Sequence, residues 1–261
     1  MRAPRRLSFC RDMKKAICIT LGDRSENHAG MQMYGELSDS GYSCDYLKKL
    51  YDKYEGAAQL YNLNIDGRFE PASVLVLRNG ADFLLEKYGV SSDDMYEELL
   101  SLEWDSKYYD TRRNKVLNKL ARHNVCFGSA GCEPDYENKI GRIVGYDEVK
   151  VMSFWKQEIE AFVGEEKGLQ AEGNYYYDVK KCGIGFHGDS ERRKVIGLNL
   201  GESREINWIW YQNGERISER IRVELNHGDM YLMSEKSAGF DWKKRKIMTV
   251  RHAAGAANYL K

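Results

Sequence analysis

The stretch IGFHGDSERRKVIGLNLGESREINWIWY, residues 184–211, contains three apolar segments separated by polar and glycine-containing turns. Short runs of β-branched, leucine and aromatic residues bounded by such turns indicate β-strands. The pattern extends to both sides of this stretch, and strands this short and this closely spaced predict a sandwich or barrel rather than a parallel sheet with crossover helices. The seven expected strands are residues 174–177, 184–187, 195–200, 206–211, 217–225, 230–233 and 247–252.

Before residue 174 the pattern alternates between strands and helices. Apolar, β-branched runs predict strands, and segments with apolar residues at helical spacing predict helices, one of which begins with the capping sequence Ser-Ser-Asp-Asp. We therefore expect an α+β protein in which an α/β N-terminal extension, residues 1–130, packs against a β-rich core, residues 131–261. The expected strands are residues 15–21 and 73–77, a strand and turn are expected over 139–146, and the expected helices are residues 44–60, 81–87, 92–102 and 153–164.

Composition limits the classes of function. The 261 residues carry no formal net charge, so no overall positive field indicates a nucleic-acid-binding protein. No stretch approaches the roughly 20 apolar residues of a membrane span, and no apolar segment follows the basic residues Arg2, Arg5 and Arg6 as it would in a secretory signal. The cysteines form no CxxC pair, so we expect reduced thiols and an intracellular location, cytoplasmic or nuclear. The six cysteines are Cys10, Cys18, Cys44, Cys126, Cys132 and Cys182.

The segment His187-Gly188-Asp189 places an imidazole and a carboxylate two positions apart. On an extended strand, side chains two positions apart emerge on the same face, so both groups can bind one metal ion. They correspond to two ligands of the 2-His-1-carboxylate triad, which leaves positions open on iron(II) for a co-substrate and oxygen. The alternative is a polar pair at the edge of a turn, because the tripeptide by itself carries little information.

The segments around this tripeptide resemble, in the same order along the chain, those of the AlkB-like family of iron(II)- and 2-oxoglutarate-dependent dioxygenases. An N-x-Y strand (174–176) precedes the HxD segment, and an SLG-like segment (LNLG, 198–201), an aromatic strand and the segment LNHGD (225–229) follow it. The last match is R-x5-R, formed by Arg245 and Arg251. The resemblance implies a double-stranded β-helix, a form of jelly roll, as the core fold.

The resemblance also implies that the chain is an enzyme. In the family's reaction 2-oxoglutarate is oxidatively decarboxylated to succinate while the substrate is hydroxylated, and hydroxylated N-methyl groups are lost as formaldehyde. His187 and Asp189 would be the catalytic ligands of iron(II). The residues implied for binding 2-oxoglutarate are Asn174, Tyr176, Arg245 and Arg251, of which the two arginines can each pair with a carboxylate.

One ligand of the family's metal site is missing from its usual place. Family members carry the second metal histidine between the HGD segment and the arginine strand, where this chain has SEKSAGFDWKKR (234–245). Three residues are candidates for the third ligand: His227, Asp241 and His252. If Arg251 points into the barrel, strand alternation turns His252 away from it. We expect a rearranged metal site and leave its third ligand open, with loss of metal binding as the alternative.

The segment between Trp104 and His123 combines aromatic and basic residues. In the resembled family the segment before the core forms a lid that binds an alkylated base, a role that would fall here to Trp104, Tyr108, Arg112 and Arg113. Ring stacking and phosphate contacts would suit a flipped or single-stranded base. The alternative is an amphipathic helix with a solvated charged face. The apolar residues at helical spacing are Val116, Leu117 and Leu120.

Three functions therefore compete. The first is an oxygenase that demethylates or hydroxylates a nucleic-acid base, the second a 2-oxoglutarate oxygenase acting on a small molecule or a protein, and the third a metal-free AlkB-like module that binds nucleic acid. The expected partners are 2-oxoglutarate, oxygen and single-stranded or base-flipped nucleic acid, without a membrane. The pattern before residue 104 indicates no function, and no sequence feature indicates an oligomeric state.

Overall fold

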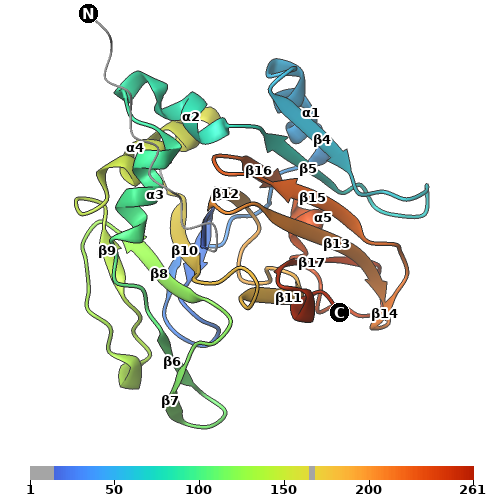
Figure 1. Ribbon diagram of the computed structural model, residues 1–261. Coiled ribbons are helices and arrows are strands. Elements are labelled where there is room, and N and C mark those ends of the chain that lie inside the picture. The colour runs from blue at the N-terminus through green and yellow to red at the C-terminus, as the bar shows by residue number, and fades with distance from the viewer. Residues whose placement is uncertain (1–14, 165–167) are drawn as a thin grey trace, which may run out of the picture.

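The computed structural model describes residues 15–164 and 168–261. The basic N-terminal residues Arg2, Arg5 and Arg6 and the thiol of Cys10 lie outside the described residues. The protein is mixed α+β and is built mainly from two curved β-sheets, with most of its helices packed on the larger sheet (Figure 1). This confirms the expected α+β class.

The larger sheet has an N-terminal strand, β1, at its centre. β1 pairs antiparallel with β12 on one side and β10 on the other. Its mostly apolar sequence follows from burial on both faces, because Ile17, Ile19 and Leu21 pack in the main hydrophobic core while Cys18 and Thr20 face a pocket. The eight strands in spatial order are β4 (Ala58–Asn62), β5 (Ser73–Leu77), β16 (Met230–Met233), β12 (Val195–Gly201), β1 (Ala16–Gly22), β10 (Gln170–Tyr176), β8 (His123–Gly128) and β9 (Ile143–Gly145).

The smaller sheet is formed entirely by the C-terminal half of the chain. From β10 to β13 the chain changes sheet at every strand, and it does so again from β15 through β16 to β17. Side chains of both sheets line a common pocket, so the sheets face each other across it. The strands are, in order, β11 (Gly183–His187), β17 (Thr249–Gly255), β13 (Arg204–Gln212) and β14 (Glu215–Arg216), with β15 (Ile221–Leu225) paired to β13.

A short fifth helix after β16 packs against β17, and the four helices before β10 cover the face of the larger sheet that points away from the pocket. Their buried side chains share one hydrophobic cluster with β1, β5 and β12. The expected capping sequence begins α3, where Ser91 and Asp94 form a reciprocal capping box. The helices are α1 (Cys44–Lys53), α2 (Gly80–Leu85), α3 (Ser92–Leu100), α4 (Lys150–Phe162) and α5 (Glu235–Ala238), and the 3₁₀ turns are η1 (Glu86–Tyr88), η2 (Tyr136–Asn138) and η3 (Ala257–Tyr259).

Most predicted elements are confirmed, including the seven strands beyond residue 173 with shifted ends. The helix expected over 44–60 ends early, because Gly56 adopts a positive φ of 98° and the chain returns as β4. The amphipathic helix considered between Trp104 and His123 is wrong. That segment forms a hairpin whose turn places Asn114 at a φ of 52°. Its strands are β6 (Lys107–Asp110) and β7 (Lys115–Asn118), and a second small hairpin comprises β2 (Arg24–Glu26) and β3 (Met33–Gly35).

The larger sheet takes strands from both sides of residue 130, where the sequence pattern places its boundary. Strands β1, β4, β5 and β8 precede that residue, and β9, β10, β12 and β16 follow it. The N-terminal part therefore supplies a central strand of the core as well as the helices packed on it. Among the described residues, no helix is long and apolar enough to cross a membrane.

Candidate metal centre and pocket

Strand register brings two histidines together on the smaller sheet. His187 of β11 lies directly opposite His252 of β17, and directly opposed residues of antiparallel strands point to the same face. Asp189 follows β11 by two residues, and its backbone N–H donates to the carbonyl of Ala238 at 2.9 Å. One Asp189 oxygen lies 3.4 Å from Nε2 of His187 and 3.6 Å from Nε2 of His252. Three potential ligand atoms therefore converge on one point.

The surroundings favour the protonation states that a metal ion needs. Nδ1 of His187 lies 2.8 Å from the carbonyl of Gly185, so it can donate there and leave the lone pair of Nε2 free. Burial, with His187 as the next cause, lowers the pKa of His252 to about 4, which keeps this imidazole neutral at pH 7. Burial alone would raise the pKa of Asp189, but His252, His187 and Arg192 outweigh it and hold that pKa below its usual value.

The donor set fits a divalent transition-metal ion. The candidate ligand atoms of His187, Asp189 and His252 all lie within 4.8 Å of one another. Two imidazoles and one carboxylate are the ligands of the facial triad, which leaves half of an octahedral coordination sphere to other molecules. In addition, Nδ1 of His252 is buried without a hydrogen-bond partner among the described residues, so only its Nε2 side is directed at other ligand atoms. The cluster can therefore hold a metal ion.

Of the three candidates for the third ligand, the structure brings only His252 to the cluster. Nδ1 of His227 accepts a hydrogen bond from the backbone of Gly201, and Asp241 pairs with Lys236 at 2.8 Å. Arg251 and His252 point to opposite faces of β17, as strand alternation requires, but it is His252 and not Arg251 that faces the pocket. Because Arg251 points away from the pocket, the next residue points into it.

A cavity of about 260 Å³ lies between the two sheets and contains the metal cluster at one end. Asn174 and Tyr176 line it, as the resemblance implies. Arg245 and Arg251, which the resemblance also implies, are not among the residues that line it. Arg245 is exposed in the turn before β17, and the guanidinium of Arg251 stacks on the ring of Tyr211 at 4.1 Å.

The arginine that does line the cavity is Arg204, at the start of β13. It is 7% exposed, and its guanidinium carbon lies 4.2 Å from the centre of the Tyr176 ring. No carboxylate of the described residues lies within ion-pair distance of it, and its Nη1 has no hydrogen-bond partner among them. A buried cation without a counter-charge is costly unless a ligand supplies the anion. Sequence reasoning missed this residue because it precedes the apolar part of its strand and resembles a charged turn residue.

Two further side chains complete the end of the cavity around Arg204, which we call the anion end. Tyr231 of β16 and Cys18 of β1 line it, with the phenol oxygen and the thiol 3.7 Å apart. The tyrosine ring occupies the space next to β12 that a side chain at residue 197 would fill, because that residue is glycine. A Cβ at Gly197 would collide with the ring. The anion end is therefore shaped by strands that are far apart in the sequence.

Polar side chains form a connected wall at the mouth of the cavity. Oδ1 of Asn174 accepts hydrogen bonds from Arg122 at 2.6 Å and from Asn124, and its Nδ2 donates to Glu172 at 3.3 Å. Glu172 in turn pairs with the buried Arg192 at 2.7 Å. The amide of Asn174 is thus largely used within this wall.

The residues predicted to bind a substrate base are only partly at the mouth. Tyr108 stacks on His28, with ring centres 3.8 Å apart, and His28 lines the cavity. Trp104 is buried and donates to the carbonyl of Leu99, so it belongs to the core. Arg112 and Arg113 lie in the exposed turn of the β6–β7 hairpin, which projects from the body of the protein (Figure 1). The loop containing His28 has no periodicity that could have indicated its position.

Comparison with known proteins identifies one extensive similarity. The chain is 42% identical over 259 residues to "Uncharacterized protein R156" of Acanthamoeba polyphaga mimivirus, an alignment that covers 96% of this chain and 99% of the viral protein. No family model matches the chain. The similarity spans both sheets and the helices, so the fold and the candidate site lie within the shared region.

Proposed function

The chain belongs to the family of the mimivirus protein R156, and for it we propose the function of an iron(II)- and 2-oxoglutarate-dependent dioxygenase. The observation that carries this proposal is the convergence of His187, Asp189 and His252 at one end of a cavity between two sheets. Two imidazoles and one carboxylate are typical of non-haem iron(II) oxygenases. Of the transition metals, iron(II) is the one for which this donor set is most characteristic.

The sheet arrangement supports a jelly-roll fold of the double-stranded β-helix type. Strands β10, β12 and β16 lie in one sheet and β11, β13, β15 and β17 in the other, so the chain winds between them. That winding gives the smaller sheet four strands and the larger sheet three. A jelly roll has eight strands, four in each sheet. The strand that completes the larger sheet here is β1, which lies between β10 and β12. In the proposed fold the N-terminal strand thus closes the core.

The residues divide the reaction between the two ends of the cavity. His187, Asp189 and His252 would hold iron(II), which supplies the activation of oxygen. Arg204, stacked on Tyr176, would pair with the distal carboxylate of 2-oxoglutarate and offset its own uncompensated charge. With a substrate seated at the mouth, the walls formed by both sheets would limit the access of water to the reacting groups.

A nucleic-acid base is the substrate we propose. A base has hydrogen-bonding edges that suit the polar wall at the mouth and a flat face that suits the stacked pair of His28 and Tyr108. Arg122 lines the mouth with no carboxylate of the described residues in ion-pair distance, and the exposed cations Arg112 and Arg113 lie on the projecting hairpin. These groups could contact phosphates.

The enzyme proposal is tested by metal content and by succinate. Protein purified anaerobically and supplied with iron(II) should bind a single ion per chain, and on addition of 2-oxoglutarate and air it should release succinate. The variant His187→Ala should do neither. Absence of both metal binding and succinate release in the unaltered protein would favour the metal-free binding module instead.

The substrate proposal is tested separately. Single-stranded oligonucleotides with N-methylated bases should raise succinate release and should yield formaldehyde in equal amount, whereas unmethylated strands should give no formaldehyde. Binding should weaken as salt is added, because phosphate contacts release counterions. Metal-dependent succinate release that no oligonucleotide stimulates would redirect the search to a small molecule or a protein.

A further inference from the structure

Arg204 is held in place by a buried asparagine that does not line the cavity. Oδ1 of Asn199, on β12, accepts a hydrogen bond from Nε of Arg204 at 2.9 Å. Asn199 is completely buried, and it lies two residues from Gly197, against which Tyr231 packs. One guanidinium nitrogen of the proposed co-substrate anchor is therefore fixed from behind, and the remainder of the group is directed toward the cavity.

The orientation of this amide is fixed by its neighbours. Nδ2 of Asn199 donates to the carbonyls of Glu202, Leu225 and Asn226 at 3.1, 3.2 and 3.3 Å. A carbonyl can only accept and a guanidinium can only donate, so the flipped amide would lose every one of these contacts. Asn199 consequently presents its oxygen, and not its NH2 group, to Arg204.

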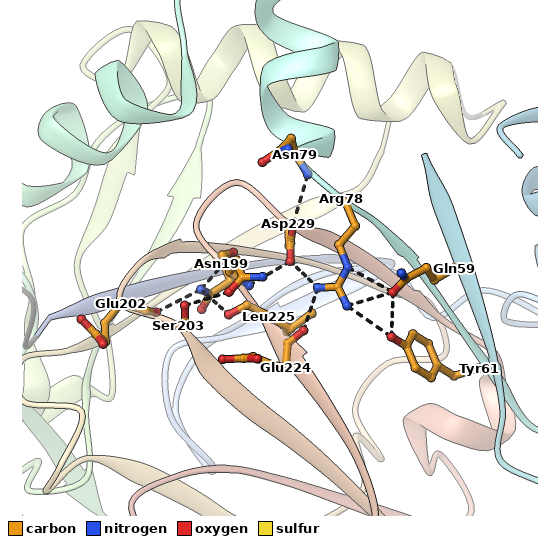
Figure 2. Close-up of polar contacts among 11 residues, drawn as sticks. Gln59, Tyr61, Arg78, Asn79, Asn199, Glu202, Ser203, Glu224, Leu225 and Asp229 are labelled. Carbon is orange, nitrogen blue, oxygen red and sulfur yellow. Dashed lines mark hydrogen bonds and ion pairs between the residues drawn. The ribbon is translucent and has the colours of Figure 1, made fainter. Parts of the chain in front are cut away.

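The loop that supplies these carbonyls is itself pinned by a buried ion pair. Asp229, with a side-chain exposure of 2%, accepts from the backbone N–H of Asn226 at 2.8 Å and pairs with Arg78 at 2.5 Å. Its other oxygen accepts from the backbone of Asn79 at 3.0 Å. The backbones of Asn199 and Asp229 are also directly joined, N–H to carbonyl, at 3.0 Å. Figure 2 shows Asn199 and Asp229 side by side in one network with Arg78.

All three guanidinium nitrogens of Arg78 donate hydrogen bonds in this network. Besides Asp229, it donates to the carbonyl of Glu224 at 2.8 Å, to Oε1 of Gln59 at 2.9 and 3.1 Å and to the hydroxyl of Tyr61 at 3.2 Å (Figure 2). Gln59 and Tyr61 belong to β4, the edge strand of the larger sheet. The network therefore reaches from the sheet edge to the cavity.

We propose that Asn199, supported by the Arg78–Asp229 pair, is a positioning residue that aims Arg204 at the distal carboxylate of a bound 2-oxo acid. The inference rests on the proposed function, since it assumes that Arg204 binds that carboxylate. An arginine has four rotatable side-chain bonds, and a ligand gains most when the fork is already in its bound orientation. Asn199 supplies this pre-organisation, and the selectivity of the pocket for a second carboxylate depends on it.

A pair of ligands isolates this effect from metal binding and from overall stability. 2-Oxoglutarate and 2-oxobutanoate share the 2-oxo acid group that contacts the metal, but only 2-oxoglutarate has the distal carboxylate. Their dissociation constants are measured by calorimetry, without oxygen, on protein loaded with manganese(II). The ratio of the two constants reports the interaction of Arg204 with the carboxylate and requires no turnover.

The unaltered protein should prefer 2-oxoglutarate on the order of a hundredfold, because a charge-assisted fork is lost with the carboxylate. Asn199→Ala should lower that ratio about tenfold and leave the affinity for 2-oxobutanoate unchanged. The matched control is Asn207→Ala, on the same strand as Arg204. Asn207 is also completely buried, but neither amide atom has a hydrogen-bond partner among the described residues. Its ratio should stay within about twofold of the unaltered protein.

Arg78→Gln provides a second route if Asn199→Ala fails to fold, because Arg78 is partly exposed and glutamine keeps N–H donors beside the buried Asp229. This variant should lower the ratio about threefold, since the loop is loosened but Asn199 is retained. An unchanged ratio in a folded Asn199→Ala variant, or in Arg78→Gln when the first does not fold, overturns the inference alone. A ratio near one in the unaltered protein overturns the role of Arg204 and this inference together.

Discussion

The two ends of the cavity are built in opposite ways. At the metal end, His187 and His252 come from neighbouring strands of one sheet, Asp189 follows one of these strands, and the three side chains can share a bound metal ion. At the anion end, Arg204 meets residues of the other sheet, and among the described residues it has no carboxylate partner. A bound metal ion can thus balance the negative charge of Asp189 at the metal end. At the anion end, the positive charge of Arg204 is balanced only when an anionic ligand binds.

This difference predicts that the two ends fail in different ways. Loss of a metal ligand removes a donor from a closely packed set, so binding of the ion itself is lost. Loss of Arg204 removes an uncompensated buried charge, so ligand affinity falls while the folded state is relieved of a cost. Variants at the two ends should therefore separate metal binding from co-substrate binding.

The largest effect is expected at the metal end. His252→Ala should weaken binding of iron(II) at least about a hundredfold, because two ligands cannot retain an ion that three hold. Metal content after anaerobic dialysis measures this. His227→Ala is the matched control, since His227 is a histidine away from the cluster that accepts a hydrogen bond from Gly201. Equal metal content in the two variants would exclude His252 as a ligand.

The next effect concerns the anion end. Arg204→Met should raise the KM for 2-oxoglutarate on the order of a hundredfold without changing metal content, because the distal carboxylate loses its partner. It should also raise the free energy of unfolding by about 1 kcal/mol, since an apolar side chain replaces a buried cation. Arg251→Met serves as the control for KM, as Arg251 stacks on Tyr211 outside the cavity. A normal KM in Arg204→Met would contradict the proposed anchor.

The contrast between the ends also explains which parts of the site the sequence predicts. His187 and Asp189 are two positions apart, so one local rule of strand geometry relates them. Arg204 and Tyr176 are brought together only by the pairing of β10 with β1 and by the packing of two sheets. No local pattern specifies such packing. Either Arg251 or His252 points into the cavity, depending on which face of β17 is turned toward it. Strand alternation alone does not determine that face.

The fold shows the same limit. Short apolar runs predicted most strands of both sheets, because these strands are encoded locally, whereas β4 and β8 were not predicted as strands. The central position of β1 was not predicted, since its apolar sequence fits any strand buried on both faces. The β6–β7 hairpin was mistaken for a helix because Val116, Leu117 and Leu120 match helical spacing, and the turn at Asn114 has no glycine to mark it.

A second buried cation, Lys119, lies behind the mouth of the cavity and can be compared with Arg204. Its effect, on the pH dependence of stability, is the smallest that we expect. Lys119 is 6% exposed and donates to Oδ1 of Asn27 at 2.8 Å, and burial lowers its pKa to about 8. Unlike Arg204, it can therefore lose its charge. In the unfolded chain a lysine titrates near pH 10.4, so between pH 8 and 10.4 the unfolded state binds more protons and the folded state gains stability as pH rises.

The variant Lys119→Met isolates this contribution. The free energy of unfolding, from urea titrations, should rise by about 2 kcal/mol more in the unaltered protein than in Lys119→Met on going from pH 7 to pH 10.4, because only the former carries the depressed lysine. Other titrating groups cancel in the difference between the two proteins. A difference that is constant over this range would show that Lys119 has an ordinary pKa. Arg204→Met, compared in the same way, should show a constant difference, since arginine stays charged throughout.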